Sequence, residues 1–141
     1  MLTLVSLGTA LWLAASPAAV ETAAQNMAVA EADTNAIYER RAREWLALVD
    51  KGNWEVSHAR AGKVFRTANS VERWQAASEM ARGPLGAVVD RKAIAFQEVP
   101  SPERYQIVRF QTQFENQPRV IETVTLQPED GEYRVVGYFL S

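Results

Sequence analysis

Hydrophobic positions between residues 37 and 81 recur every three or four residues, which is the spacing of one face of a helix. The pattern predicts three helices with apolar or small residues on one side: Ile37, Ala42, Trp45, Leu46 and Val49; His58, Ala61, Phe65 and Ala68; Val71, Trp74, Ser78 and Ala81. Gly52 is expected to end the first helix in a left-handed cap, and Asn53 to cap the second. Asn69 and Glu72 resemble a capping box that opens the third helix, and Arg82-Gly83-Pro84 ends it.

After Pro84 the period changes to two, which predicts strands. Four strands are expected, marked by Ile94 and Phe96; by Val108, Phe110 and Phe114; by Val120, Val124 and Leu126; and by Tyr133 to Leu140. Asp130-Gly131 predicts a two-residue hairpin turn, because both residues tolerate positive φ. Helices followed by hairpin-linked strands indicate an α+β fold, with three helices on one face of a four-stranded antiparallel sheet.

A two-residue turn also predicts the register of the last hairpin, in which Leu126 faces Val135, Val124 faces Gly137 and Glu122 faces Phe139. Cross-strand partners share a face, so Glu122 is expected among apolar side chains that include Phe139. The outer face would carry Thr123, Thr125, Arg134, Val136 and Tyr138. For the second strand, a three-residue loop over 116–118 would place Val108, Phe110, Thr112 and Phe114 on the apolar face.

The first charged side chain is Glu21, and Ser16-Pro17-Ala18 fits the small-x-small rule of leader cleavage sites. We therefore expect a signal peptide over 1–18, a linker over 19–34 and a single α+β domain over 35–141, in a periplasmic or secreted protein. The alternative is an uncleaved N-terminal anchor, because about 20 apolar residues span a bilayer. No Lys or Arg precedes the apolar run.

Composition excludes several function classes. The 15 basic and 17 acidic residues give a net charge of −2, which argues against nonspecific nucleic-acid binding. The absence of cysteine excludes disulfides, thiolate metal sites and cysteine nucleophiles. A single histidine, His58, excludes sites that need two imidazoles, and so most zinc enzymes. We expect neither a cofactor nor a metal ion.

Glu122 is the sharpest candidate for chemistry, because a carboxylate on an apolar sheet face loses hydration and enzymes use such groups as acids or bases. His58 could meet it as the second member of an acid/base pair. Gly137 would leave space where a ligand could approach it, and Thr112 is a further candidate for binding a ligand or partner. The structural alternative is that Glu122 pairs with a helix-borne arginine such as Arg82, and that His58 is a packed residue.

On the outer face, Arg109, Arg134 and Tyr138 could together bind an anionic partner, since arginine and aromatic side chains anchor interfaces. A solvated sheet face carries such residues too, so this interpretation stays open. The same face offers a surface for a homodimer.

Motifs spread over residues 36 to 140 resemble the bacterial domain-of-unknown-function family 4019. They are Trp45 with Asp50-Lys51-Gly52, Phe65 followed by Trp74, Arg82-Gly83-Pro84-Leu85-Gly86, Phe110-Gln111-Thr112-Gln113-Phe114, Glu122-Thr123-Val124-Thr125, and Gly131 to Tyr138. The chain departs from the family pattern at Ser57-His58 and at Tyr133, where relatives often carry tryptophan. The resemblance implies an exported domain of the nuclear-transport-factor-like or cystatin-like kind, without an established activity.

Together these observations favour a non-catalytic module of the cell envelope that binds a small ligand or an envelope protein. The alternative is a small enzyme that uses Glu122, with His58, for acid/base chemistry in a cone-shaped pocket.

Overall fold

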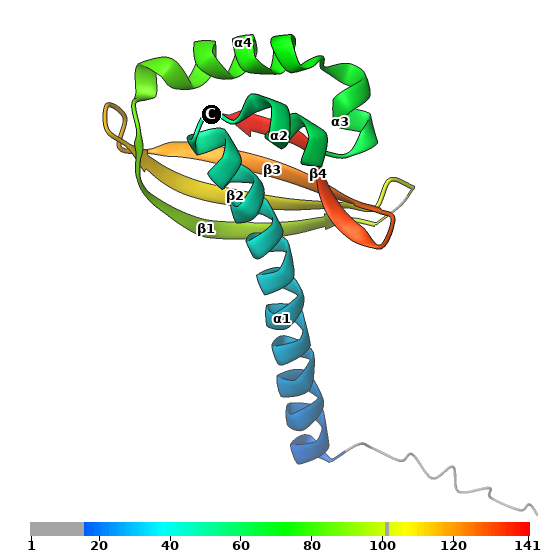
Figure 1. The fold of residues 1–141 in the computed structure, drawn as a ribbon. Coiled ribbons are helices and arrows are strands. Elements are labelled where there is room, and N and C mark those ends of the chain that lie inside the picture. Colours follow the sequence, from blue (N-terminus) through cyan, green and yellow to red (C-terminus); the bar gives the residue numbers. More distant parts are fainter. Residues whose placement is uncertain (1–15, 101) are drawn as a thin grey trace, which may run out of the picture. The chain divides into compact units, whose positions relative to one another are not determined.

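The computed structural model describes residues 16–100 and 102–141 (Figure 1). Most of the expected signal peptide lies outside these residues. The described residues separate into two units, one ending at Asp33 and one running from Thr34 to Ser141. Helix α1 (Pro17–Asp50) spans this division. The expected linker over 19–34 is therefore helical, with exposed side chains on almost every residue.

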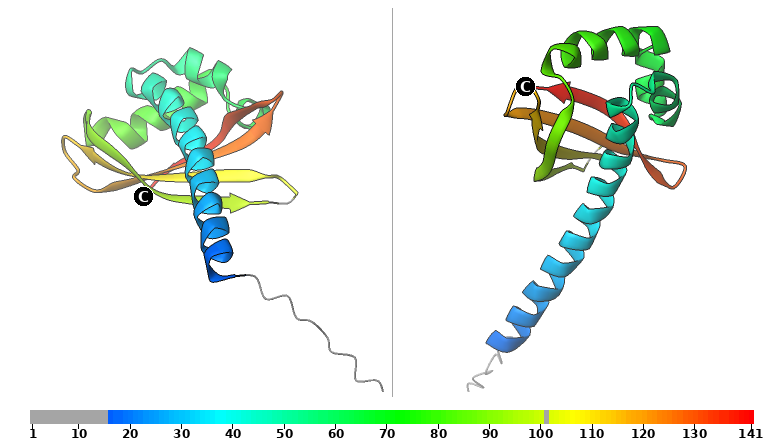
Figure 2. Two further views of the ribbon diagram at one scale, coloured as in Figure 1. Left: turned by 90° about the horizontal axis from the view of Figure 1, so that it is seen from below. Right: turned by 60° about the vertical axis from the view of Figure 1, so that its left-hand side comes forward.

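Within residues 34–141, α1 is followed by α2 (Trp54–Arg60), α3 (Lys63–Ala68), α4 (Val71–Arg82) and a short 3₁₀ helix, η1 (Gly83–Leu85). The strands are β1 (Val88–Val99), β2 (Tyr105–Phe114), β3 (Val120–Glu129) and β4 (Glu132–Leu140). In this part of the chain they form one antiparallel sheet in the order β1-β2-β3-β4. Figure 1 shows α2, α3 and α4 on one side of the sheet, and Figure 2 shows its twist. The predicted α+β fold is confirmed.

The helix ends explain one difference from the prediction. Gly52 adopts a positive φ of 68° and Asn53 caps α2, as predicted. The expected second helix is split into α2 and α3 at Ala61 and Gly62, where the backbone is extended. The Gly62 N–H donates to the Val135 carbonyl at 2.7 Å, and a Cβ at Gly62 would lie only 2.7 Å from Val136 Cγ1. This close approach to β4 both interrupts the helix and requires glycine.

The expected capping box at Asn69 is wrong. Ser70 caps α4 instead, and its hydroxyl accepts from the Arg73 N–H at 3.2 Å. Asn69 belongs to the end of α3, where its side-chain amide donates to the Phe65 carbonyl at 3.1 Å. Both residue types are good caps, so the identity of the cap depends on where α3 ends.

The core lies between the helices and the sheet and is rich in aromatic rings. The Trp45 and Trp74 rings lie 5.3 Å apart, and each packs edge-on against Phe65. The two indole N–H groups donate to Ser57, one to its carbonyl and one to its hydroxyl, each at 2.9 Å. A buried indole N–H needs such an acceptor, so Ser57 holds both rings in place.

A β-bulge in the last hairpin corrects the predicted register. Leu126 pairs with Val135 as expected, but Thr125 pairs with Gly137, so Val136 is the extra residue. Beyond the bulge every side chain of β4 changes face. Phe139, expected among the apolar side chains, is 64% exposed. Tyr138, expected on the outer face, lies on the inner face, where it reaches Glu122.

On β2 the predicted face is confirmed, because Val108, Phe110, Thr112 and Phe114 are all buried. The connection to β3 has five residues, 115–119, rather than three. The register therefore moves by two positions, which leaves each side chain on the expected face.

Candidate functional site

Glu122 lies on β3 with no exposed surface, among the apolar side chains of the inner face, as predicted. Its Oε1 accepts from Arg91 Nε at 2.7 Å and from the Thr112 hydroxyl at 2.5 Å. Its Oε2 accepts from the Tyr138 hydroxyl and lies 3.8 Å from Arg82 Nη1. Both carboxylate oxygens are therefore occupied by neighbours from β1, β2, β4 and α4. The predicted pairing with Arg82 is confirmed, together with a second arginine that the sequence did not indicate.

Asp50 closes this arrangement from the end of α1. Its carboxylate binds Arg91 through two contacts of 2.8 and 3.0 Å, and Arg82 through one of 2.5 Å. Two guanidinium groups thus bridge two carboxylates, so the charges balance. We call Asp50, Arg82, Arg91, Thr112, Glu122 and Tyr138 the buried charge network. A buried charge is tolerated only when paired and hydrogen bonded, and these contacts meet that condition.

The protonation states in the network follow from these contacts. Burial raises the pKa of Asp50, but hydrogen bonds and positive charges from Arg91 and Arg82 outweigh it and hold that pKa below its ordinary value. Burial and then the Glu122 carboxylate raise the pKa of the Tyr138 hydroxyl. Burial lowers the pKa of Arg91, but its hydrogen bonds to Asp50 and Glu122 have the larger effect, so the pKa lies above the ordinary value of arginine. Near neutral pH, Asp50 and Arg91 are charged and Tyr138 is a hydrogen-bond donor.

His58 does not join Glu122. A ring nitrogen, Nε2, lies 2.6 Å from the Asn69 carbonyl, and the ring packs at 6.3 Å from Phe65. The predicted acid/base pair is therefore not formed by the side chains that the structure describes. His58 is instead a packed, half-buried residue that joins α2 to the end of α3.

The space expected at Gly137 opens on the other face of the sheet. A Cβ on Gly137 would lie 3.4 Å from the Thr125 side chain, on the outer face. The bulge at Val136 produces this change as well. Thr112 lies beside Glu122, as expected, but its hydroxyl is already bound to that carboxylate.

The three residues of the expected outer-face patch are not brought together. Arg109 donates to Gln97 at 3.2 Å on the neighbouring strand β1. Tyr138 lies inside the fold. Arg134 lines a separate cleft.

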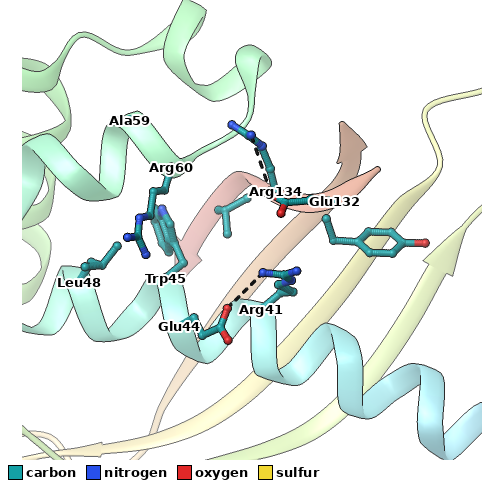
Figure 3. Close-up of a pocket in the computed structure, with 10 residues that line it drawn as sticks. Arg41, Glu44, Trp45, Leu48, Ala59, Arg60, Glu132 and Arg134 are labelled. Carbon is teal, nitrogen blue, oxygen red and sulfur yellow. Dashed lines mark hydrogen bonds and ion pairs between the residues drawn. The ribbon is translucent and has the colours of Figure 1, made fainter. Parts of the chain in front are cut away.

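This cleft has a volume of about 460 Å³ and lies between α1, α2 and β4 (Figure 3). Its apolar lining comes from Trp45, Leu48, Ala59, Tyr133 and Val135. Its charged lining comes from Arg41, Glu44, Arg60, Glu132 and Arg134. Small-molecule sites have volumes of about 300–1,000 Å³ and combine apolar walls with a few polar groups. The cleft lies within this range of volume, and five of its ten lining residues are charged, so it is more polar than such sites usually are. Every lining residue belongs to the unit from Thr34 to Ser141.

Neither Asp50 nor Arg91 was predicted as a partner of Glu122, and neither Arg41 nor Arg60 was predicted as a cleft residue. Arg91 pairs with Thr112 across β1 and β2, a position that depends on the register of a strand pair with two bulges. No local signal distinguishes Arg91 from its charged neighbours Asp90 and Lys92. Arg41 from α1 and Arg60 from α2 line the same cleft, which forms only when these helices and β4 come together.

No curated protein matches this chain. The family model described as Protein of unknown function (DUF4019) matches residues 41–138. That segment includes every member of the buried charge network and every residue that lines the cleft. The family resemblance carried by the sequence motifs is thereby confirmed, and the chain belongs to the DUF4019 family.

Proposed function

We propose that the domain is a non-catalytic module that binds a small organic molecule in the cleft between α1, α2 and β4. The observation that carries the proposal is the cleft itself, with about 460 Å³ of space beside the Trp45 and Tyr133 rings. Apolar and aromatic side chains supply contact area in such sites, and polar groups orient the ligand. Both kinds of group line this cleft.

The contacts of Glu122 favour binding over catalysis. A general acid or base must reach the proton that it transfers. Glu122 has no exposed surface, and its two oxygens are bound to Arg91, Thr112 and Tyr138. Neither Glu122 nor His58 lines the cleft. The alternative of a small enzyme that uses these two residues therefore gains no support from their geometry.

We propose further that the domain acts in the cell envelope, after removal of residues 1–18. Support comes from the sequence pattern, an apolar run followed by Ser16-Pro17-Ala18. The mass of the protein recovered from its own host tests this directly. A mature chain that begins at Ala19 supports export with cleavage, and a chain that retains the apolar run supports the anchor instead.

The binding proposal is tested by native mass spectrometry of the full-length gene product, recovered gently from the envelope of its host. We expect the wild-type protein to carry an additional small-molecule mass. Ala59→Trp places a large side chain in the cleft from an exposed helical position, so it should remove the additional mass. Ala76→Trp, on the exposed face of α4, is the matched control and should retain it.

Two results would contradict the proposal. One is a ligand-free wild-type protein, which would point to protein partners. The other is an additional mass that persists in Ala59→Trp, which would place the ligand elsewhere.

A further inference from the structure

The three arginines of the cleft lack strong acceptors from the protein. Arg41 makes a single contact with Glu44, at the outer limit of hydrogen bonding, 3.5 Å. The nearest carboxylate to Arg134 is that of Glu132, at 3.9 Å. Among the side chains that the structure describes, Arg60 makes no ion pair. A guanidinium has five N–H donors, so most of the arginine donors in this cleft have no acceptor among the described side chains.

Arg134 carries the most informative of these donors. Its Nε is buried and has no hydrogen-bond partner among the described residues. A buried donor without an acceptor destabilises the fold, so such groups are rare in folded proteins and call for an explanation. A ligand that brings an acceptor into the cleft, with a small rotation of the Arg134 side chain, would remove this cost.

The arrangement of the charges indicates what kind of acceptor fits. Figure 3 shows the guanidinium groups of Arg41, Arg60 and Arg134 on different sides of the cleft, with Glu44 beside Arg41 and Glu132 beside Arg134. Three arginines and two glutamates leave one net positive charge in the lining. One unit of charge matches a monoanion better than a doubly charged phosphate. The planar fork of arginine matches a carboxylate with two parallel hydrogen bonds.

The rest of the lining indicates the body of the ligand. Trp45 and Val135 are buried side chains, and Leu48 and Tyr133 are half-buried. Trp45 and Val135 are already covered by the core, so Leu48 and Tyr133 supply the apolar surface that a ligand can cover. Covering that surface favours a ligand with an apolar part. We infer that the cleft binds a monocarboxylate with an apolar body, whose carboxylate is held by Arg134. This inference rests on the proposed function and specifies the chemical class of its ligand.

A matched pair of probes tests the charge requirement. Phenylacetate and phenylacetamide have the same shape and differ in charge, and each is titrated into the ¹⁵N-labelled full-length protein. The arginine Nε–H and tryptophan indole signals report binding. We expect phenylacetate to bind at least tenfold more tightly than phenylacetamide and to shift the Arg134 signal. Octanoate and octanamide, with an aliphatic body, should show the same preference.

The variants separate a specific contact from general attraction. Arg134→Gln should remove the preference for the carboxylate, so that both probes bind equally weakly. Arg109→Gln removes one positive charge from the outer face and should keep the preference. Equal binding of the acid and the amide to the wild-type protein would overturn the inference while leaving the binding function intact. The inference would also be overturned if the small molecule bound to the protein from its host were uncharged and were lost in Ala59→Trp. Failure of all four probes to bind at millimolar concentration would also overturn the inference.

Discussion

The domain holds two groups of arginines that differ in what surrounds them. In the buried charge network, Arg82 and Arg91 bind two carboxylates at distances down to 2.5 Å, and their side chains are only 11% and 8% exposed. In the cleft, the closest carboxylate to any arginine is at 3.5 Å. The same residue type therefore serves as a structural bridge in one region and remains available for a ligand in the other.

The comparison shows that burial of a charge does not by itself identify a functional site. Glu122 is the most buried charged group of the described chain, and its contacts explain it fully. The less buried Arg134 leaves a donor without an acceptor. An ionisable group indicates a ligand when its hydrogen bonds are incomplete, and a structural role when they are complete.

The largest expected effect is on Glu122. Glu122→Gln keeps the size of the side chain but removes its charge, which leaves Arg91 and Arg82 sharing Asp50. Removing one partner of a buried ion pair costs about 3–5 kcal/mol, so we expect the free energy of unfolding to fall by that amount. Urea denaturation measures it. Glu98→Gln, at an exposed position of β1, should change it by less than about 0.5 kcal/mol. Equal stability of the two variants would contradict the structural role of the network.

A smaller loss is expected for Tyr138→Phe, which removes one hydrogen bond to the Glu122 carboxylate. Hydrogen bonds to charged groups contribute about 1.5–3 kcal/mol, so the unfolding free energy should fall within that range. Tyr105→Phe, at the start of β2, is the matched control. If the two variants were equally stable, Tyr138 would not support the carboxylate.

Asp50→Asn should lower the unfolding free energy by about 1–2 kcal/mol at neutral pH. The loss is moderate because the Asp50 side chain is 27% exposed, so water replaces some of its hydrogen bonds to the two arginines. Because Asp50 has a lowered pKa in the folded state, its contribution is present above its unfolded pKa of about 4. The contribution is lost as the pH falls through the lower folded value. Urea denaturation from pH 7 to pH 2 should therefore show a weaker acid destabilisation in Asp50→Asn than in the wild type. Asp90→Asn, exposed on β1, should retain the wild-type slope, and parallel slopes for all three proteins would contradict this.

The smallest change in stability is expected in the cleft. Arg60→Gln should alter the unfolding free energy by less than about 0.5 kcal/mol, since Arg60 has no carboxylate partner among the described residues. Arg134→Gln should not lower the unfolding free energy, because it removes a buried Nε–H that has no acceptor among these residues. Arg91→Gln should cost about 3–5 kcal/mol under the same conditions. A large loss for Arg134→Gln would mean that the cleft arginines are structural as well, and the contrast between the two regions would disappear.

Much of the fold could be predicted from local patterns. Gly52, Asn53 and the Asp130-Gly131 turn behave as their residue types indicate, since caps and turns depend on a few neighbouring positions. The prediction of which β2 side chains lie on the inner face was also correct, because a shift of two positions in the register leaves every side chain on the same face. The family followed from motifs distributed along the whole domain.

The candidate site was predicted less completely, because its geometry depends on distant contacts. The bulge at Val136 lies where Gly62 approaches β4. Gly137 beside it was the local signal, since an isolated glycine within a strand often marks a bulge. That one extra residue moved Tyr138 inward and Phe139 outward. The partnership of Asp50 with Arg91 joins positions 41 residues apart, beyond the reach of any local pattern.

The buried charge network also has a consequence for the order of folding. Its hydrogen bonds join positions between 10 and 56 residues apart, and they connect two helices with all four strands of the described sheet. Contacts across such separations form only after the intervening loops have closed. Until β4 is in place, Glu122 lacks the Tyr138 hydroxyl and the inner face is open to water. We therefore expect the network to close in the last step of folding, so that docking of the final strand completes the domain cooperatively.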